Sequence, residues 1–567
     1  MATPAWFDVT TYGADATGVA DSYTAIKAAI AAAEAVNGGT VYFPRGTYSI
    51  GKHDASSGIF IQNDKPLHFL GDGIGISNIR VLAGSYSGAF FLLLINNNNT
   101  TFTDLTFDGN RNNLTRTWTY TPTVQNNALY RITINGTNYD YTSDGSATAT
   151  EICDGLRAVI TEPGIVKSGT TTVVLTNTPP TVPTVFPPSS NLTVVATPDE
   201  QTHFIQVEDC KTIRINRCRF LNCIRDGIRI LGTAPDDGHY VDDLVIDGCA
   251  FYNCGRSGIT CQRAFKNTRI TSNLFELTND QSIDFEPSAT GAGVANPKQI
   301  IISHNIVRDT LENPETPGQR PICVTLSGVS GSEPNFQVIF SDNIIKGTIQ
   351  GVRMSNMLIC DNIIDASDTL DNGVNALNFN RSASNIIIRG NIITGATGED
   401  TINILFNNAS APSDLIISDN VITSPASKVA MTTNSANRMT INGNRIQCLT
   451  NDGTIGLQLL TSVANFPLQD CVLSGNMLSG YSTGMFIATG AAGPASIDNV
   501  AIVGNVFAHR GAGSKKGIEF QKGGANTITN VVIANNSFGT GISTPLTGTS
   551  NFTGQVIGGW GFNSFAN

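Results

Sequence analysis

The sequence predicts an all-β fold, a right-handed parallel β-helix (a solenoid of stacked coils) with an N-terminal helix cap and a small α+β insert. Three observations predict it. The chain has 567 residues, more than one compact core usually organises. It contains 56 Gly, and only 14% of its residues are charged, a turn-rich and β-rich composition. Finally, a short apolar strand that ends at an Asn recurs along the chain.

The Asn repeat sets the phase of the coils. Units such as Ile301-Ile302-Ser303-His304-Asn305 recur, with their Asn at Asn273, Asn305, Asn343, Asn362, Asn391, Asn420, Asn444, Asn476, Asn505 and Asn536. These positions lie 19 to 38 residues apart, a spacing typical of solenoid coils with loops of variable length. One coil cannot bury its inner face alone, so coils stack about 4.8 Å apart. We expect the Asn at bends, because Asn tolerates left-handed backbone and bonds nearby main-chain groups.

The remaining patterns divide the chain into five segments. Residues 21–36 predict an Ala-rich helix, with Asp21 or Ser22 as N-cap and Asn37-Gly38-Gly39 as its stop. Such a helix covers the open end of a β-solenoid, which otherwise exposes unpaired strand edges. The expected division is a cap (1–50), first coils (51–117), an insert (118–202), the main β-helix (203–536) and a C-terminal cap (537–567).

Charge and cysteine content exclude several classes of partner and site. The net charge of -11 and the pI of about 5.0 argue against nucleic acid, which needs a positive footprint. No apolar stretch reaches the length of a membrane span. The first residues lack the charged and then apolar pattern of a signal peptide. We therefore expect either that the protein is made and used without classical secretion, or that the given sequence begins after a segment that has been removed. The 11 cysteines show no CxxC pairs; Cys218 to Cys249 repeats the interval Cys223 to Cys254, which indicates thiols stacked as buried apolar groups.

The N-terminal residues carry a family resemblance. The runs Tyr12–Asp21, Thr24–Ile30 and Gly38–Tyr48 resemble the opening of the pectate-lyase-like superfamily of right-handed β-helices. That group includes polygalacturonase-like hydrolases, lyases, and many bacteriophage tailspikes and capsule depolymerases. The resemblance is specific for the fold and weak for the reaction, because one fold hosts many functions.

A second resemblance concerns the insert. From Trp118 to Thr202 the coil rhythm breaks, with a helix predicted near Ala147–Ile160 and a Thr/Pro-rich stretch from Thr178 to Pro188. This segment is similar to a module of bacteriophage tail proteins. The resemblance implies a tailspike or depolymerase: a homotrimer on a virion tail, made in the host cytoplasm, that contacts other tail proteins and a bacterial surface polysaccharide. We expect no anchoring domain before the cap, and the roughly thirty residues after the last Asn repeat are too few for a large trimerisation domain, so attachment would rest on the insert or on partner proteins.

Three neighbouring coils can be aligned by their inward residues. Ile228, Ile259 and Ile283 align, and strand alternation then turns Arg229, Thr260 and Asp284 outward in one column. The neighbouring outward column is Leu231, Gln262 and Glu286. Asp284 and Glu286 would face solvent side by side, about 7 Å apart along the strand.

This carboxyl pair is the candidate catalytic site. One carboxylic acid can protonate a glycosidic oxygen while an ionised partner attacks or activates water, and their repulsion raises one pKa. We expect Glu286 as acid and Asp284 as base or nucleophile; the alternative is a pair of solubilising charges. The string Ile283–Pro287 resembles an acidic strand motif of β-helix proteins that act on carbohydrates.

Expected substrate-binding residues surround the pair: Arg225, Asp226, Arg229, Arg256, Gln262 and Arg263. Their arginines could bind sugar carboxylates, or instead pair with nearby aspartates. No metal site or cofactor is expected, since the His spacing suggests no zinc site. The sequence thus favours a tailspike-like protein that binds and hydrolyses a surface polysaccharide. The alternatives are a polysaccharide lyase or epimerase, extracellular in that case, and a glycan-binding adhesin without catalysis.

Overall fold

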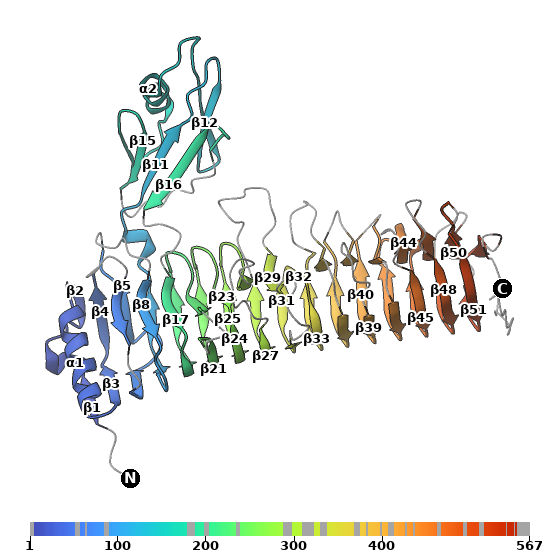
Figure 1. Cartoon of the computed structure of the whole chain (residues 1–567), viewed down its shortest axis with the longest axis horizontal. Helices are drawn as coiled ribbons and strands as arrows, with labels where there is room; N and C mark the ends of the chain where they lie inside the picture. Colours follow the sequence, from blue (N-terminus) through green and yellow to red (C-terminus); the bar gives the residue numbers. More distant parts are fainter. Residues whose placement is uncertain are drawn as a thin grey trace.

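The computed structural model is a parallel β-helix with three long walls, as the sequence predicts (Figure 1). It describes residues 5–51, 57–62, 65–83, 90–178, 188–197, 203–233, 239–286, 297–308, 322–328, 337–367, 375–380, 384–396, 400–405, 413–425, 428–434, 437–461, 467–490, 496–509, 515–524, 526–539, 541–548, 550 and 552. The predicted C-terminal cap therefore lies largely outside the described residues.

Three parallel sheets form the walls. Within the described residues, sheet A has 16 strands from β1 (Trp6–Asp8) to β51 (Ile528–Ala534), and sheet B has 16 from β2 (Thr17–Asp21) to β52 (Ser537–Phe538). Sheet C has 15, from β5 (Ser57–Ile61) to β53 (Thr544–Thr547). Its central strands are β17 (His203–Glu208), β20 (Ile228–Gly232), β23 (Ile259–Arg263), β26 (Ile283–Glu286), β29 (Ile322–Ser327), β32 (Thr348–Val352), β35 (Leu377–Asn380), β38 (Ile402–Leu405), β41 (Met431–Asn434) and β44 (Gly453–Thr461).

Inward side chains repeat from coil to coil and hold the rungs in register. Phe251 stacks on Phe220 with ring centroids 4.9 Å apart, and on Phe275 at 4.8 Å. Such contacts add about 0.5–1.5 kcal/mol per pair to the gain from burial. Cys218, Cys249, Cys223 and Cys254 are buried free thiols, as the spacing predicted.

The repeated Asn residues form a buried ladder at the corner between sheets A and B. Asn391 donates from Nδ2 to the Ile359 carbonyl (3.1 Å) and to Asn420 Oδ1 (2.9 Å), and its own Oδ1 accepts from Asn362 Nδ2 (2.9 Å). The expectation of left-handed Asn was wrong at these positions. The residue before the ladder Asn takes that conformation, as at Asp361 (φ 59°) and Gly390 (φ 66°), and this turns the Asn amide inward.

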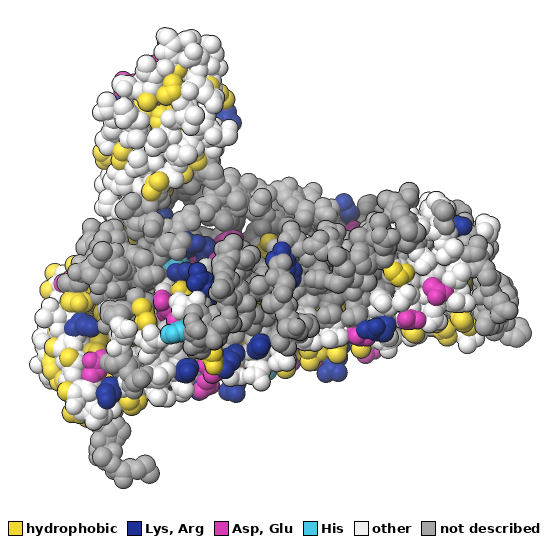
Figure 2. All heavy atoms as spheres, in the orientation of Figure 1, with side chains coloured by type: hydrophobic (Ala, Val, Ile, Leu, Met, Phe, Trp, Pro, Cys, Tyr) yellow, Lys and Arg dark blue, Asp and Glu magenta, His cyan; other side chains and the backbone are white. Residues whose placement is uncertain are grey.

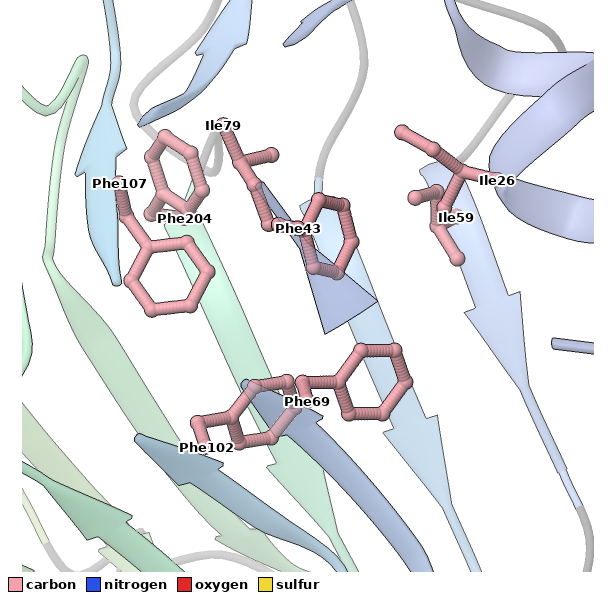
Figure 3. A pocket seen from close by; sticks show the side chains of 8 residues that line it. All are labelled: Ile26, Phe43, Ile59, Phe69, Ile79, Phe102, Phe107 and Phe204. Carbon is pink, nitrogen blue, oxygen red and sulfur yellow. The ribbon is translucent and has the colours of Figure 1, made fainter. Parts of the chain in front are cut away.

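A helix covers the N-terminal end of the solenoid. Helix α1 spans Tyr23–Ala35, two residues later than the predicted start. Its N-cap position is Ser22, whose side chain makes no cap bond, while Asp21 Oδ1 accepts from the Tyr23 amide at 2.9 Å. Beneath the helix, an interior cavity is lined only by Ile and Phe side chains, from Ile26 to Phe204 (Figure 3). It lies in the apolar core and offers nothing polar to bind a sugar.

The segment that breaks the coil rhythm stands off the solenoid (Figure 1). Its four antiparallel strands are, in sheet order, β14 (Ile165–Ser168), β15 (Val173–Asn177), β11 (Thr117–Pro122) and β16 (Leu192–Thr197). A hairpin, β12 (Leu129–Ile134) with β13 (Thr137–Thr142), and helix α2 (Ala149–Val159) pack against them around a separate core that includes Trp118 and Tyr130. Among the described residues, neither α1 nor α2 is long and apolar enough to span a membrane.

Candidate active site

The register of sheet C brings the three aligned coils together as predicted. Ile228 pairs with Ile259, and Ile259 with Ile283; all three are fully buried on one wall. Arg229, Thr260 and Asp284 follow in the next column, one above another. A slip of one residue would have turned every one of these side chains to the opposite face.

Asp284 does not face open solvent, which corrects the expectation for this column. It is only 2% exposed, whereas the Glu286 side chain on the same strand is 39% exposed. The two carboxyls are hydrogen-bonded to each other. They therefore titrate as one coupled pair that shares a proton.

The shared proton belongs to Asp284, the reverse of the expected order. Burial raises the pKa of Asp284 well above its usual range, and the neighbouring Glu286 charge raises it further. Burial also acts to raise the pKa of Glu286, but Arg256 and hydrogen bonds from Asp284 and Gln262 outweigh it and lower that pKa. At neutral pH Asp284 is thus the acid and Glu286 the carboxylate.

Arg256 connects the carboxyl pair to the coil below. Its Nη1 lies 3.0 Å from Glu286 Oε1, and its Nη2 donates to Thr260 Oγ1 at 3.0 Å. The other edge of the guanidinium grips Asp226, with Nε 2.9 Å from Oδ1 and Nη2 3.0 Å from Oδ2. This bidentate contact fixes the plane of the guanidinium and aims it at Glu286.

Asp226 is a positioning residue rather than a substrate contact. It is fully buried, and it also accepts from the Ser257 amide (3.0 Å) and lies 2.9 Å from His203 Nδ1. Burial acts to raise the pKa of Asp226, but Arg256 and His203 hold it well below its usual range. Sequence reasoning missed His203, which opens β17, because its link to Asp226 exists only across coils.

A chain of side-chain amides fixes the other oxygen of Glu286. Gln262 Nε2 donates to Glu286 Oε2 at 2.6 Å, and Gln262 Oε1 accepts from Arg229 Nε at 2.8 Å. Arg229 Nη1 donates to Gln206 Oε1 at 3.0 Å, and Gln206 Nε2 donates to Glu208 Oε2 at 2.6 Å. Gln206 was missed, although it precedes Arg229 in the same column.

Three further charged residues lie around this network. Arg225, in the turn before β20, is 8% exposed, and Arg263 ends β23 in a left-handed conformation (φ 60°). Asp280 was not among the predicted site residues; burial raises its pKa to about 6, opposed by Arg256. Figure 2 shows charged and His side chains gathered on the coils next to the insert. The described residues contain no cluster of three or more potential metal ligands.

Residues 6–91 match the family model described as rhamnogalacturonase A/epimerase, pectate lyase-like. This N-terminal region is pectate-lyase-like. The pectate-lyase-like match covers α1 and the first coils and ends long before β26, so it includes neither Asp284 nor Glu286.

Individual relatives cover different parts of the chain. Mannuronan C5-epimerase AlgE1 of Azotobacter vinelandii is 35% identical over 112 residues, which are 19% of this chain and only 8% of that protein. The catalytic unit of the GH87 α-1,3-glucanase from Streptomyces thermodiastaticus strain HF3-3 aligns with 97% of this chain and 71% of its own, at 14% identity and a TM-score of 0.41. The Pseudomonas phage phi297 tailspike gp61 aligns with 96% of this chain and 82% of its own, at 11% identity and a TM-score of 0.43.

Proposed function

We propose that this chain binds a polysaccharide along sheet C and hydrolyses it with Asp284 and Glu286. The observation that carries the proposal is the proton-sharing pair, in which burial keeps Asp284 protonated while Arg256 keeps Glu286 ionised. A carboxylic acid held neutral at pH 7 beside a fixed carboxylate is the arrangement that acid–base hydrolysis requires.

The pair would act as one unit in the reaction. Its single proton passes to the glycosidic oxygen as the bond to the anomeric carbon breaks, and both carboxylates are then ionised. Arg256 offsets the second negative charge from 3.0 Å. Water attacks the anomeric carbon and returns one proton to the pair, which restores the starting state. Arg229, Gln262 and Arg263, outward and partly exposed, would contact the glycan, while Arg225 and Asp226 hold the site from beneath.

The test combines isosteric variants with an assay of released reducing ends. Asp284→Asn and Glu286→Gln should each lower the release of reducing ends by about 10²–10⁴-fold, the usual worth of a general acid or base. Asp414→Asn, which removes an exposed carboxylate far along the solenoid, should leave the rate unchanged. Full activity in both site variants would refute the assignment.

The second candidate is a lyase or C5-epimerase, favoured by the match to AlgE1. Such an enzyme removes the proton at C5 of a uronate. Ultraviolet absorbance of unsaturated uronate products would identify a lyase, and a changed C5 configuration without cleavage an epimerase. Glycan binding with no product in any assay would instead identify an adhesin.

The tailspike part of the proposal rests on the sequence resemblances of the cap and the insert. It places the chain on a virion tail as a homotrimer that contacts other tail proteins and a bacterial surface polysaccharide. In this proposal the five segments predicted from the sequence are separate structural units of each subunit. Sedimentation equilibrium measures the subunit number directly. A monomer at micromolar concentration would argue against the trimer without affecting the proposed hydrolysis.

A further inference from the structure

The outward column that contains Asp284 continues along sheet C for six more strands. Asp284 pairs with Thr325, and each following residue pairs with the next across parallel strands. We call these six residues the amide row: Thr325, Gln350, Asn378, Asn403, Thr432 and Gln458. With strands about 4.8 Å apart, the row extends roughly 29 Å beyond the carboxyl pair towards the C-terminal end.

Three members of the amide row have buried polar atoms without a partner. Thr325 Oγ1, Asn378 Oδ1 and Asn403 Oδ1 make no hydrogen bond to any described residue. Thr432, by contrast, donates to Asp400 Oδ2 at 2.8 Å. A buried polar atom left unpaired costs about 1–3 kcal/mol, and native proteins keep few of them. The side chains that carry these three atoms are partly exposed, so a ligand lying on sheet C can reach them.

The amide row also differs in charge from the rungs before it. Arg229 and Asp284 stand in the preceding part of the column, and Glu286 and Arg256 adjoin it. The six residues of the row are uncharged. Sugar hydroxyls can both donate to and accept from its amides and hydroxyls, whereas a sugar carboxylate would meet only neutral donors and no cation in the row. At its far end, Gln458 pairs with Phe486, a partly exposed ring.

We infer that the amide row binds a run of neutral, hydroxyl-bearing sugars on the C-terminal side of the carboxyl pair. The inference rests on the proposed polysaccharide binding and narrows its substrate class. A glycan with a carboxylate on every sugar fits this surface poorly. Acidic sugars are confined to the arginine-bearing rungs around Arg229 and Arg263.

The test measures binding separately from cleavage. Full-length protein carrying Asp284→Asn and Glu286→Gln is applied to an array of neutral oligosaccharides and of oligouronates of matched length. Neutral oligosaccharides should bind, and adding Asn378→Leu with Asn403→Leu should weaken them at least about 10-fold, since each lost hydrogen bond is worth about 1 kcal/mol. Gln447→Leu, which removes an outward amide from sheet B, should not weaken them. Binding of oligouronates alone, or of no glycan, overturns the inference.

Stability distinguishes a binding role from a structural one. Replacing unpaired buried polar atoms with apolar groups should leave the melting temperature of the Leu variant unchanged or raised. A clear fall would show that the amides support the fold, and it would overturn the inference. Thr325→Val, which keeps the side-chain shape, provides the same comparison if the double Leu variant does not fold. If the wild type cleaves the glycan but no row variant weakens its binding, the amide row is rejected and the proposed hydrolysis stands. If the wild type binds the glycan without cleaving it, only the proposed hydrolysis is rejected.

Discussion

Replacing Asp226 with Asn should lower the free energy of local unfolding of the coils around the site. Asp226 is fully buried and holds Arg256 through two contacts of 2.9 and 3.0 Å, with His203 Nδ1 at 2.9 Å. Asn keeps the shape but removes the charge and turns an NH₂ group towards other donors. Breaking a buried ion pair costs about 3–5 kcal/mol. Since Arg256 retains Glu286 as a partner, we expect the lower end, about 3 kcal/mol.

The assay is amide hydrogen exchange of strands β17, β20 and β23. Solenoids open locally, so exchange reports the free energy of opening of these rungs rather than of the whole chain. At pH 7 Asp226→Asn should speed their exchange by about 10²-fold, equivalent to 3 kcal/mol. Asp414→Asn, in a half-exposed ion pair with Arg438, should change exchange by no more than a few-fold.

The pH dependence supplies the decisive control. The folded-state pKa of Asp226 lies below its unfolded value of about 3.9. Its stabilisation is therefore fully present above that pH and is lost as the pH falls further towards the folded-state pKa. The difference between wild type and Asp226→Asn should shrink below about pH 4. Equal exchange at pH 7, or an undiminished difference at pH 3, would refute the ion-pair argument.

Three other results are expected. Asn391→Leu interrupts the ladder and should lower the free energy of unfolding by at least about 2 kcal/mol in urea titration, because neighbouring buried amides lose partners; an unchanged midpoint would make the ladder incidental. Phe251→Ala should cost about 3–5 kcal/mol in the same assay; a clearly smaller loss would show that the neighbouring rings close the gap. Asp280→Asn should move the alkaline limb of the pH–rate profile to lower pH, because the Asp280 charge helps to raise the pKa of Asp284; a shift to higher pH would contradict this.

The sequence by itself determined the winding of the chain and the phase of its rungs. Apolar residues at alternate positions face inward, so Ile228, Ile259 and Ile283 align once the inward positions of the three coils are matched. The outward column of Arg229, Thr260 and Asp284 followed from the same alternation. The same alternation puts Asp284 and Glu286 on one face of β26.

Only the tertiary structure decided what that column does chemically. The protonation order of Asp284 and Glu286 depends on burial and on Arg256, which reaches them from the turn of another coil. The roles of Asp226 and His203 arise in the same way, through contacts between residues distant in the chain. Strand periodicity gives the direction of a side chain, whereas its pKa is set by the solvent exclusion and charges that neighbouring coils impose.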